Sequence, residues 1–176
     1  AGCTVVIKPA SATPLTMLYL MQALADAGLP AGVVNCVVSS RSSDVSAPIL
    51  ADSRLRKLTF TGSTEVGRSL LEQSAGHVLR TSMELGGNVP FVVFEDADLD
   101  EAVAGAMAAK MRNMGEACTA ANRIHVDNAV RAEFTEKLAA RMAALATGPG
   151  DQAGSQVGPL ITAKQRATVD ELVQRS

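Results

Sequence analysis

The chain has 176 residues, of which 47% are hydrophobic and 19% charged, with 16 basic residues against 18 acidic ones. This apolar content is too high for a disordered chain, and the length suits one domain or two small ones. The net charge of -2 argues against a nucleic-acid partner, because general nucleic-acid binders carry a basic excess or patch. No apolar run is long enough for a membrane helix, so we also expect no membrane partner.

The cysteines and histidines give no metal-binding spacing. Cys3, Cys36 and Cys118 form no CxxC pair and are odd in number, which favours a reducing, cytoplasmic setting over a secreted disulfide scaffold. His77 and His125 lie far apart in the chain, so we expect no zinc site.

The predicted elements alternate between strands and helices. Short β-branched or apolar runs predict strands at 4–8, 33–38, 57–60, 81–85, 90–94 and 123–126. Helical spacing predicts helices at 14–27, 47–52, 64–74, 99–113, 131–146 and 162–176, with a polar loop at 39–46. This order favours the α/β class, with a parallel sheet covered by helices on both faces. The conformationally permissive pair Gly86-Gly87 marks the expected domain boundary.

Two strand ends carry residues suited to a phosphate. One strand runs through Gly62 and Ser63 into a helix, whose first amide groups and dipole attract anions, although Ser63 is equally suited to being an ordinary N-cap. Lys8 ends another strand, at the rim where open α/β sheets bind ligands, but a solvated lysine has the same pattern. Neither segment is GxGxxG, so a standard dinucleotide fingerprint is not indicated.

Two further residues suit covalent chemistry. Cys118 lies in a segment of small residues after Gly115, where a thiolate can act as a nucleophile, although a free cysteine also packs as an inert hydrophobe. Glu84 ends a strand beside two glycines, where a carboxylate can act as a general base or stand at the surface with no role. We favour a Cys-Glu pairing over a Cys-His pairing, because His125 falls on a predicted strand.

In this order, the motifs resemble the aldehyde dehydrogenase superfamily over essentially the whole chain. The residues that carry the resemblance are Ala1–Pro9, Phe60–Ser63, Glu84–Gly87, and Gly115 with Cys118 and Arg123. Asn88–Phe91 and Met111–Asn113 resemble the NADP-dependent succinate-semialdehyde dehydrogenase branch. Because the chain starts in a strand pattern and stops in a helix pattern, it looks like an internal piece of a longer protein.

The resemblance implies the family's parallel sheet, with residues 1–85 in the Rossmann-like cofactor-binding domain and residues 86–176 in the catalytic domain. It implies that Cys118 attacks an aldehyde to give a thiohemiacetal and, after hydride transfer to a nicotinamide cofactor, a thioester. Glu84 then activates the water that hydrolyses this thioester. Gly62 and Ser63 hold the pyrophosphate, and Leu85 lies by the nicotinamide.

The resemblance also carries expectations about cofactor and substrate. The cofactor-binding segment is Lys8, Pro9, Ala10 and Ser11. NAD-preferring members often have Glu at the Ser11 position, so a serine there, with the positive charge of Lys8, predicts NADP as the cofactor and leaves NAD possible. Arg112 matches an arginine that binds the distal carboxylate of succinate semialdehyde, and the alternative is a surface arginine that ends a helix.

Three other interpretations stay open at this point. The chain could be a nucleotide-binding module with an inert Cys118, a Cys-Glu hydrolase without a cofactor, or a dehydrogenase for another semialdehyde or aliphatic aldehyde.

The resemblance places the family's oxyanion asparagine upstream of Ala1. We therefore expect this stretch alone to be inactive and the full-length protein to be an active homo-oligomer. Glu116 stands where the family usually has Gln, which adds a negative charge near the thiol.

Overall fold

The computed structural model describes residues 2–175, so Ala1 of the first motif and Ser176 of the last predicted helix lie outside the described residues. The chain divides into two compact units, Ala1–Glu84 and Leu85–Ser176. We call them the first unit and the second unit, and each is described by itself.

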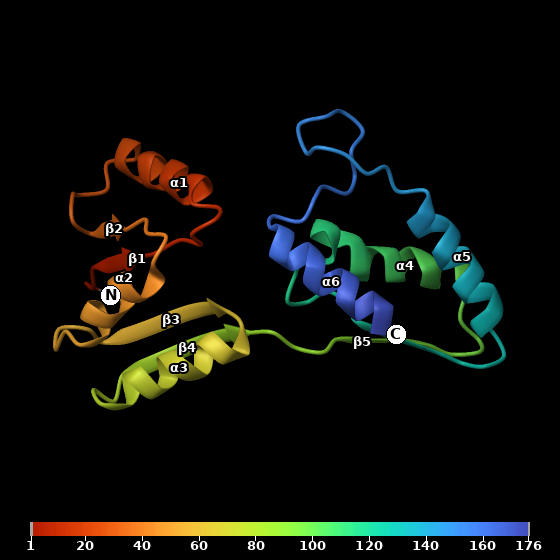
Figure 1. Ribbon diagram of the computed structural model, residues 1–176, viewed down its shortest axis with the longest axis horizontal. Helices are drawn as coiled ribbons and strands as arrows, with labels where there is room; N and C mark the ends of the chain where they lie inside the picture. Colours follow the sequence, from red (N-terminus) through yellow and green to blue (C-terminus); the bar gives the residue numbers. More distant parts are fainter. Residues whose placement is uncertain (1, 176) are drawn as a thin grey trace. The chain divides into compact units, whose positions relative to one another are not determined.

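Strands and helices alternate in both units (Figure 1). The first unit contains β1 (Val5–Ile7), α1 (Leu15–Asp26), β2 (Val34–Cys36), α2 (Ser42–Leu50), β3 (Lys57–Gly62), α3 (Thr64–Ala75) and β4 (Arg80–Leu85), whose last residue already belongs to the second unit. The second unit continues with β5 (Pro90–Val93), α4 (Leu99–Met111), the 3-10 helix η1 (Arg112–Gly115), β6 (Arg123–Val126), α5 (Arg131–Ala143) and α6 (Ala163–Arg175). The predicted α/β class is confirmed.

In the first unit, β1 and β2 pair in parallel, with α1 as the crossover between them. Val5 lies opposite Val34, and Ile7 lies opposite Cys36. Because parallel strands end at the same edge of a sheet, this register places the loop after β1 beside the loop after β2. That edge is the rim to which the sequence assigned Lys8.

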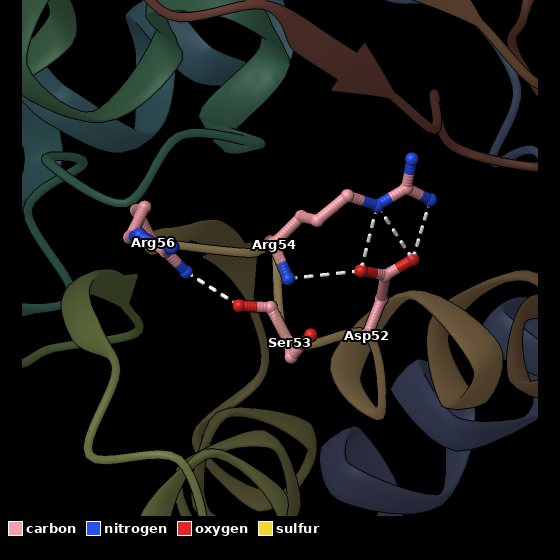
Figure 2. Close-up of polar contacts among 4 residues, drawn as sticks. All are labelled: Asp52, Ser53, Arg54 and Arg56. Carbon is pink, nitrogen blue, oxygen red and sulfur yellow. Dashed lines mark hydrogen bonds and ion pairs between the residues drawn. The ribbon is translucent and has the colours of Figure 1, made fainter.

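A polar turn leads the chain into β3 (Figure 2). Asp52 accepts hydrogen bonds from the backbone N–H of Arg54 at 2.9 Å and from its Nε and Nη2 at 3.0 and 2.7 Å. These contacts hold the pKa of the Asp52 carboxyl far below its ordinary value. Arg56 donates from Nη1 to the Ser53 carbonyl at 2.5 Å. The turn is therefore fixed just before the strand that ends at Gly62.

The second unit has the larger core. Strands β5 and β6 pair in parallel, and α4 and α5 lie side by side (Figure 1). The core is formed by Val93, Val103, Ala106, Phe134 and Leu138. On the surface, Lys137 of α5 binds Asp100 of α4 at 2.8 Å and Glu133 at 3.0 Å. This ammonium lowers the pKa of Asp100, and both carboxylates raise the pKa of Lys137.

The structure differs from the predicted elements at the start of α2 and in how the strands are grouped. Residues 42–46, predicted as part of a loop, are the first turns of α2, and Arg41 and Asp44 form an exposed ion pair at 2.7 Å where the helix begins. The strands described in residues 2–175 form three two-stranded sheets, β1-β2, β3-β4 and β5-β6. The β1-β2 and β5-β6 pairs are parallel, as predicted. In each pair, a helix connects the first strand to the second. No helix within residues 2–175 is both long and apolar enough to cross a membrane.

The substitution Phe134→Ala tests the core of the second unit. Phe134 is 1% exposed, so its removal leaves a cavity and costs about 3–5 kcal/mol of unfolding free energy, measured by urea denaturation. Glu136→Ala, at an exposed site on the same helix, is the control and changes the free energy by less than about 0.5 kcal/mol. Equal losses in the two variants contradict the assigned core.

Candidate active site

The candidate nucleophile follows an abrupt end of α4. After Met111 the backbone enters the left-handed region at Asn113, Met114 and Gly115, with φ of 52°, 58° and 79°. A Cβ at Gly115 would lie 3.0 Å from the carbonyl oxygen of Lys110. Glycine is therefore required there for two reasons, the φ angle and the close approach of the helix backbone. The helix predicted to reach residue 113 ends at Met111 because this reversal begins.

Hydrogen bonds fix the chain that leaves this reversal. Asn113 donates from Nδ2 to the Glu116 carbonyl at 3.0 Å, and the Glu116 N–H donates to the Asn113 carbonyl at 2.9 Å. The Ala120 N–H then donates to the Ala117 carbonyl at 3.0 Å, which closes a four-residue turn. Cys118 lies at a corner of this turn as a free, exposed thiol. Its sulfur is accessible, as a nucleophile requires.

A shallow hollow of about 80 Å³ adjoins the Cys118 turn. It is lined by Ala108, Ala109, Arg112, Ala117, Thr119 and Ala120. Arg112 is thus placed beside the two residues that flank Cys118, and it is the charged residue of this lining. The small alanine side chains leave room next to the guanidinium.

The chain beyond Cys118 is tied to the segment that follows Glu84. Asn122 accepts a hydrogen bond at Oδ1 from the Val89 N–H at 2.9 Å and donates from Nδ2 to Asn88 Oδ1 at 2.7 Å. Sequence reasoning missed Asn122. Its one signal was its place four residues after Cys118 in the printed sequence.

The predicted general base lies at the end of the first unit. Glu84 is exposed near the end of β4, and Leu85 after it is half-buried. Both are followed by exposed Gly86 and Gly87. A carboxylate in this place is open to water, which a general base for hydrolysis needs.

The loops after β1 and β2 meet through polar side chains. Lys8 donates from Nζ to the Ser11 hydroxyl at 3.3 Å, and Ser11 donates from Oγ to the Ser39 carbonyl at 2.9 Å. Lys8 also donates to the carbonyl of Pro9, which is buried, whereas Ala10 is exposed. An ammonium and a hydroxyl are thus held together at the carboxyl edge of the β1-β2 pair. Ser39 was not singled out from the sequence.

The start of α3 carries the other predicted phosphate-binding residues. Ser63 is the N-cap, and its hydroxyl accepts from the Val66 N–H at 3.3 Å. The space at Gly62 is filled by the ring of Phe60, which a Cβ would approach to 2.4 Å. Gly62 therefore allows close packing as well as the turn into the helix. Glu65 adds a carboxylate to the first helical turn, so backbone amides and the Ser63 hydroxyl are the groups suited to an anion here.

The remaining cysteines and histidines fall outside these clusters. Cys3 is exposed and precedes β1, so it does not pack within a strand, whereas Cys36 on β2 is half-buried. His125 lies exposed on β6, as its strand position predicted. Within residues 2–175, no group of three or more histidine, cysteine or acidic side chains is arranged to hold a metal ion.

The family follows from comparison with known proteins. The model of the aldehyde dehydrogenase family matches residues 1–176, and the chain belongs to this family. The chain is 64% identical over 173 residues to a succinate-semialdehyde dehydrogenase of Paenarthrobacter nicotinovorans. The matched region covers 98% of this chain and 38% of that protein. It is 49% identical over 171 residues to an NADP(+) succinate-semialdehyde dehydrogenase of Escherichia coli, covering 97% of this chain and 35% of that protein.

Solved structures agree with this assignment. An NADP-dependent enzyme of Escherichia coli matches with a TM-score of 0.93 and 50% identity, over 97% of this chain and 35% of that one. An aldehyde dehydrogenase of Brucella melitensis matches with a TM-score of 0.95 and 47% identity, over 99% of this chain and 36% of that one. The fold predicted from the resemblance is confirmed. The chain spans just over a third of the length of these relatives.

The substitution Gly115→Ala tests the left-handed reversal. It forces an L residue to φ 79° and brings its Cβ to 3.0 Å from a carbonyl, so we expect a loss of at least about 1–2 kcal/mol in urea denaturation. Gly150→Ala is the matched control, because nothing lies within 4 Å of its Cβ and its φ is not positive. A Gly115→Ala protein as stable as the control contradicts the reversal.

Proposed function

We propose that the complete protein oxidises succinate semialdehyde to succinate with NADP. The overall reaction consumes one aldehyde, one water and one oxidised cofactor, and releases the carboxylic acid, the reduced cofactor and a proton. The observation that carries this proposal is the exposed thiol of Cys118 at the corner of a hydrogen-bonded turn, in a chain of the aldehyde dehydrogenase family.

The nucleophile in this proposal is the Cys118 thiolate. It attacks the aldehyde carbon, so that a C–S bond forms and the carbonyl electron pair moves to oxygen, which gives a thiohemiacetal. A nicotinamide cofactor, when bound, would supply the acceptor for the hydride of that carbon, and Cys118 would then hold the acyl group as a thioester. The exposed corner position of the sulfur supports this role because a substrate can reach it without displacing the core.

The general base in this proposal is Glu84. Its carboxylate takes a proton from water while the water oxygen adds to the thioester carbonyl, and the Cys118 thiolate leaves as the carboxylic acid forms. The exposure of Glu84 near the end of β4 supports the role because water can reach the carboxylate.

The cofactor proposal is NADP bound by the first unit. Lys8 supplies a positive charge and Ser11 a hydroxyl donor, held 3.3 Å apart, and this pair fits the extra phosphate of NADP. Ser63 and the first amides of α3 fit the pyrophosphate, with Gly62 in the turn before them. Leu85, half-buried at the end of β4, is proposed to lie by the nicotinamide. A named NADP(+) relative supports the same choice.

The substrate proposal rests on Arg112. Its guanidinium lines the hollow beside the Cys118 turn, where it can bind a carboxylate through two parallel hydrogen bonds. The matched relatives include succinate- and glutarate-semialdehyde dehydrogenases, and both of these substrates carry a carboxylate at the end opposite the aldehyde. A carboxylate-bearing semialdehyde therefore fits this chain better than an uncharged aldehyde.

Cys118→Ser in the complete protein tests the proposed function. We expect kcat for succinate semialdehyde oxidation, followed by absorbance of the reduced cofactor, to fall at least about a thousandfold. Cys3→Ser is the matched control, because Cys3 is also a free, exposed thiol, and it leaves kcat unchanged. Activity retained by the Cys118 variant overturns the proposal.

Ser11→Glu tests the cofactor assignment. The new carboxylate repels the extra phosphate of NADP and replaces a donor with an acceptor, so the NADP-to-NAD ratio of kcat/KM falls by about tenfold or more. Thr16→Glu, at an exposed site on α1, adds the same charge away from the loop and leaves the ratio unchanged. An unaltered ratio in the Ser11 variant shows that this loop does not select the cofactor.

Arg112→Ala tests the substrate assignment. Loss of the guanidinium raises KM for succinate semialdehyde by about tenfold or more, because a charge-assisted bond to the carboxylate is lost. KM for butanal, which has no carboxylate, stays within about twofold. An equal rise for both aldehydes assigns Arg112 to the structure of the turn and not to substrate recognition.

A further inference from the structure

We propose that Thr119 is a substrate-binding residue, whose hydroxyl donates to the distal carboxylate of the substrate together with the Arg112 guanidinium. The inference rests on the proposed function, in which Cys118 attacks a semialdehyde that carries a carboxylate. It adds a residue that selects this substrate over an uncharged aldehyde. The groups that carry the inference all lie in the second unit.

The hollow of about 80 Å³ beside the Cys118 turn has two polar side chains in its lining. These are Arg112 and Thr119, both exposed, and the rest of the lining is alanine. Within residues 2–175, the Thr119 hydroxyl forms no hydrogen bond, and the Arg112 guanidinium forms no hydrogen bond or ion pair. A guanidinium and a hydroxyl thus line one small space, and their donor hydrogens are available to a ligand.

The character of this lining favours an anion. The guanidinium carries a fixed positive charge, and none of the described residues that line the hollow is acidic. Two carbonyls of the lining are already engaged, since the Ala109 carbonyl accepts from the Ala121 N–H and the Ala117 carbonyl from the Ala120 N–H, both at 3.0 Å. The lining therefore suits a carboxylate, which is negative and accepts hydrogen bonds, better than a neutral or cationic group.

Both donors are held in place by the backbone. Arg112 directly follows α4, and the left-handed reversal then turns the chain back toward this helix. The hydrogen bond between Ala120 and Ala117 fixes the turn that contains Thr119. Because the two donors are positioned before a substrate arrives, binding loses little free energy to ordering of the chain.

Thr119 also directly follows the proposed nucleophile. In succinate semialdehyde, only two methylene groups separate the aldehyde carbon from the carboxylate. A substrate this short needs carboxylate donors close to the Cys118 sulfur, and the hollow beside the Cys118 turn provides them. Butanal has the same four-carbon chain without a carboxylate, so it gains nothing from either donor.

The test measures KM and kcat of the complete protein for succinate semialdehyde and butanal, with NADP in excess and the absorbance of the reduced cofactor as the signal. The variants are Thr119→Val, which replaces the hydroxyl with a methyl group, and Thr119→Ser, which keeps the hydroxyl. Thr135→Val, at an exposed site on α5 outside the hollow, is the matched control.

We expect Thr119→Val to raise KM for succinate semialdehyde by about tenfold, because a hydrogen bond to a charged group is lost, and to change kcat by less than about twofold. KM for butanal stays within about twofold, as do both KM values of the Ser variant and of the control. An equal rise for both aldehydes, or no rise for succinate semialdehyde, overturns the inference. A Ser variant as impaired as the Val variant assigns the effect to the methyl group and overturns it too.

The double variant Arg112→Ala with Thr119→Val tests whether both donors hold the same carboxylate. Once the guanidinium is lost, the carboxylate is no longer held in the hollow, so the Thr119 change then raises KM by less than about threefold. A rise of about tenfold in both backgrounds contradicts joint binding.

Arg112→Ala alone separates the inference from the proposed function. If this variant does not discriminate between the two aldehydes, the substrate assignment of the proposed function is wrong, and the role of Thr119 is overturned with it. If Arg112→Ala behaves as expected and Thr119→Val changes nothing, only the role of Thr119 is overturned.

Discussion

The left-handed run at Asn113, Met114 and Gly115 is the constraint on which the candidate active site depends. It ends α4 abruptly and turns the chain back, and the backbone accepts this conformation because Gly115 has no Cβ to meet the Lys110 carbonyl. The two residues before it hold positive φ at a conformational cost, which persists only where surrounding contacts fix it. Here the bonds of Asn113 to Glu116 and of Ala121 to α4 do so. Such stored strain is typical of functional segments.

In each unit, a parallel pair of strands brings polar side chains together at one edge of the pair. Parallel strands bring their carboxyl ends to one edge, so the β1-β2 pair places Lys8, Ser11 and Ser39 together although Ser39 is far from the others in the chain. In the second unit the parallel β5-β6 pair brings its amino ends together, and this places Asn122 beside the segment before Pro90. The Lys8 ammonium and the Ser11 hydroxyl are therefore brought together by the β1-β2 pair, and the segment after the Cys118 turn is held by the β5-β6 pair.

Most of the strands and helices were predictable from the sequence, whereas several of the polar contacts were not. The β-branched run at 4–8 and the apolar spacing of residues 99–111 set a strand and a helix by local preference, and both are present. The start of α2 was missed because its serine-rich composition favours a loop by local preference. Asn122 and Ser39 were missed because their partners are distant in sequence, whereas Cys118 was singled out because small residues around a lone thiol are a local pattern.

The central claim is that Cys118 is acylated during aldehyde oxidation. It is tested most directly by mixing the complete protein with succinate semialdehyde and NADP, quenching with acid, and mapping the modified peptide by mass spectrometry. The account predicts a succinyl group on the Cys118 peptide and unmodified thiols at Cys3 and Cys36, which serve as internal controls. A succinyl group on either of the other cysteines, or turnover with no modified Cys118, would contradict it.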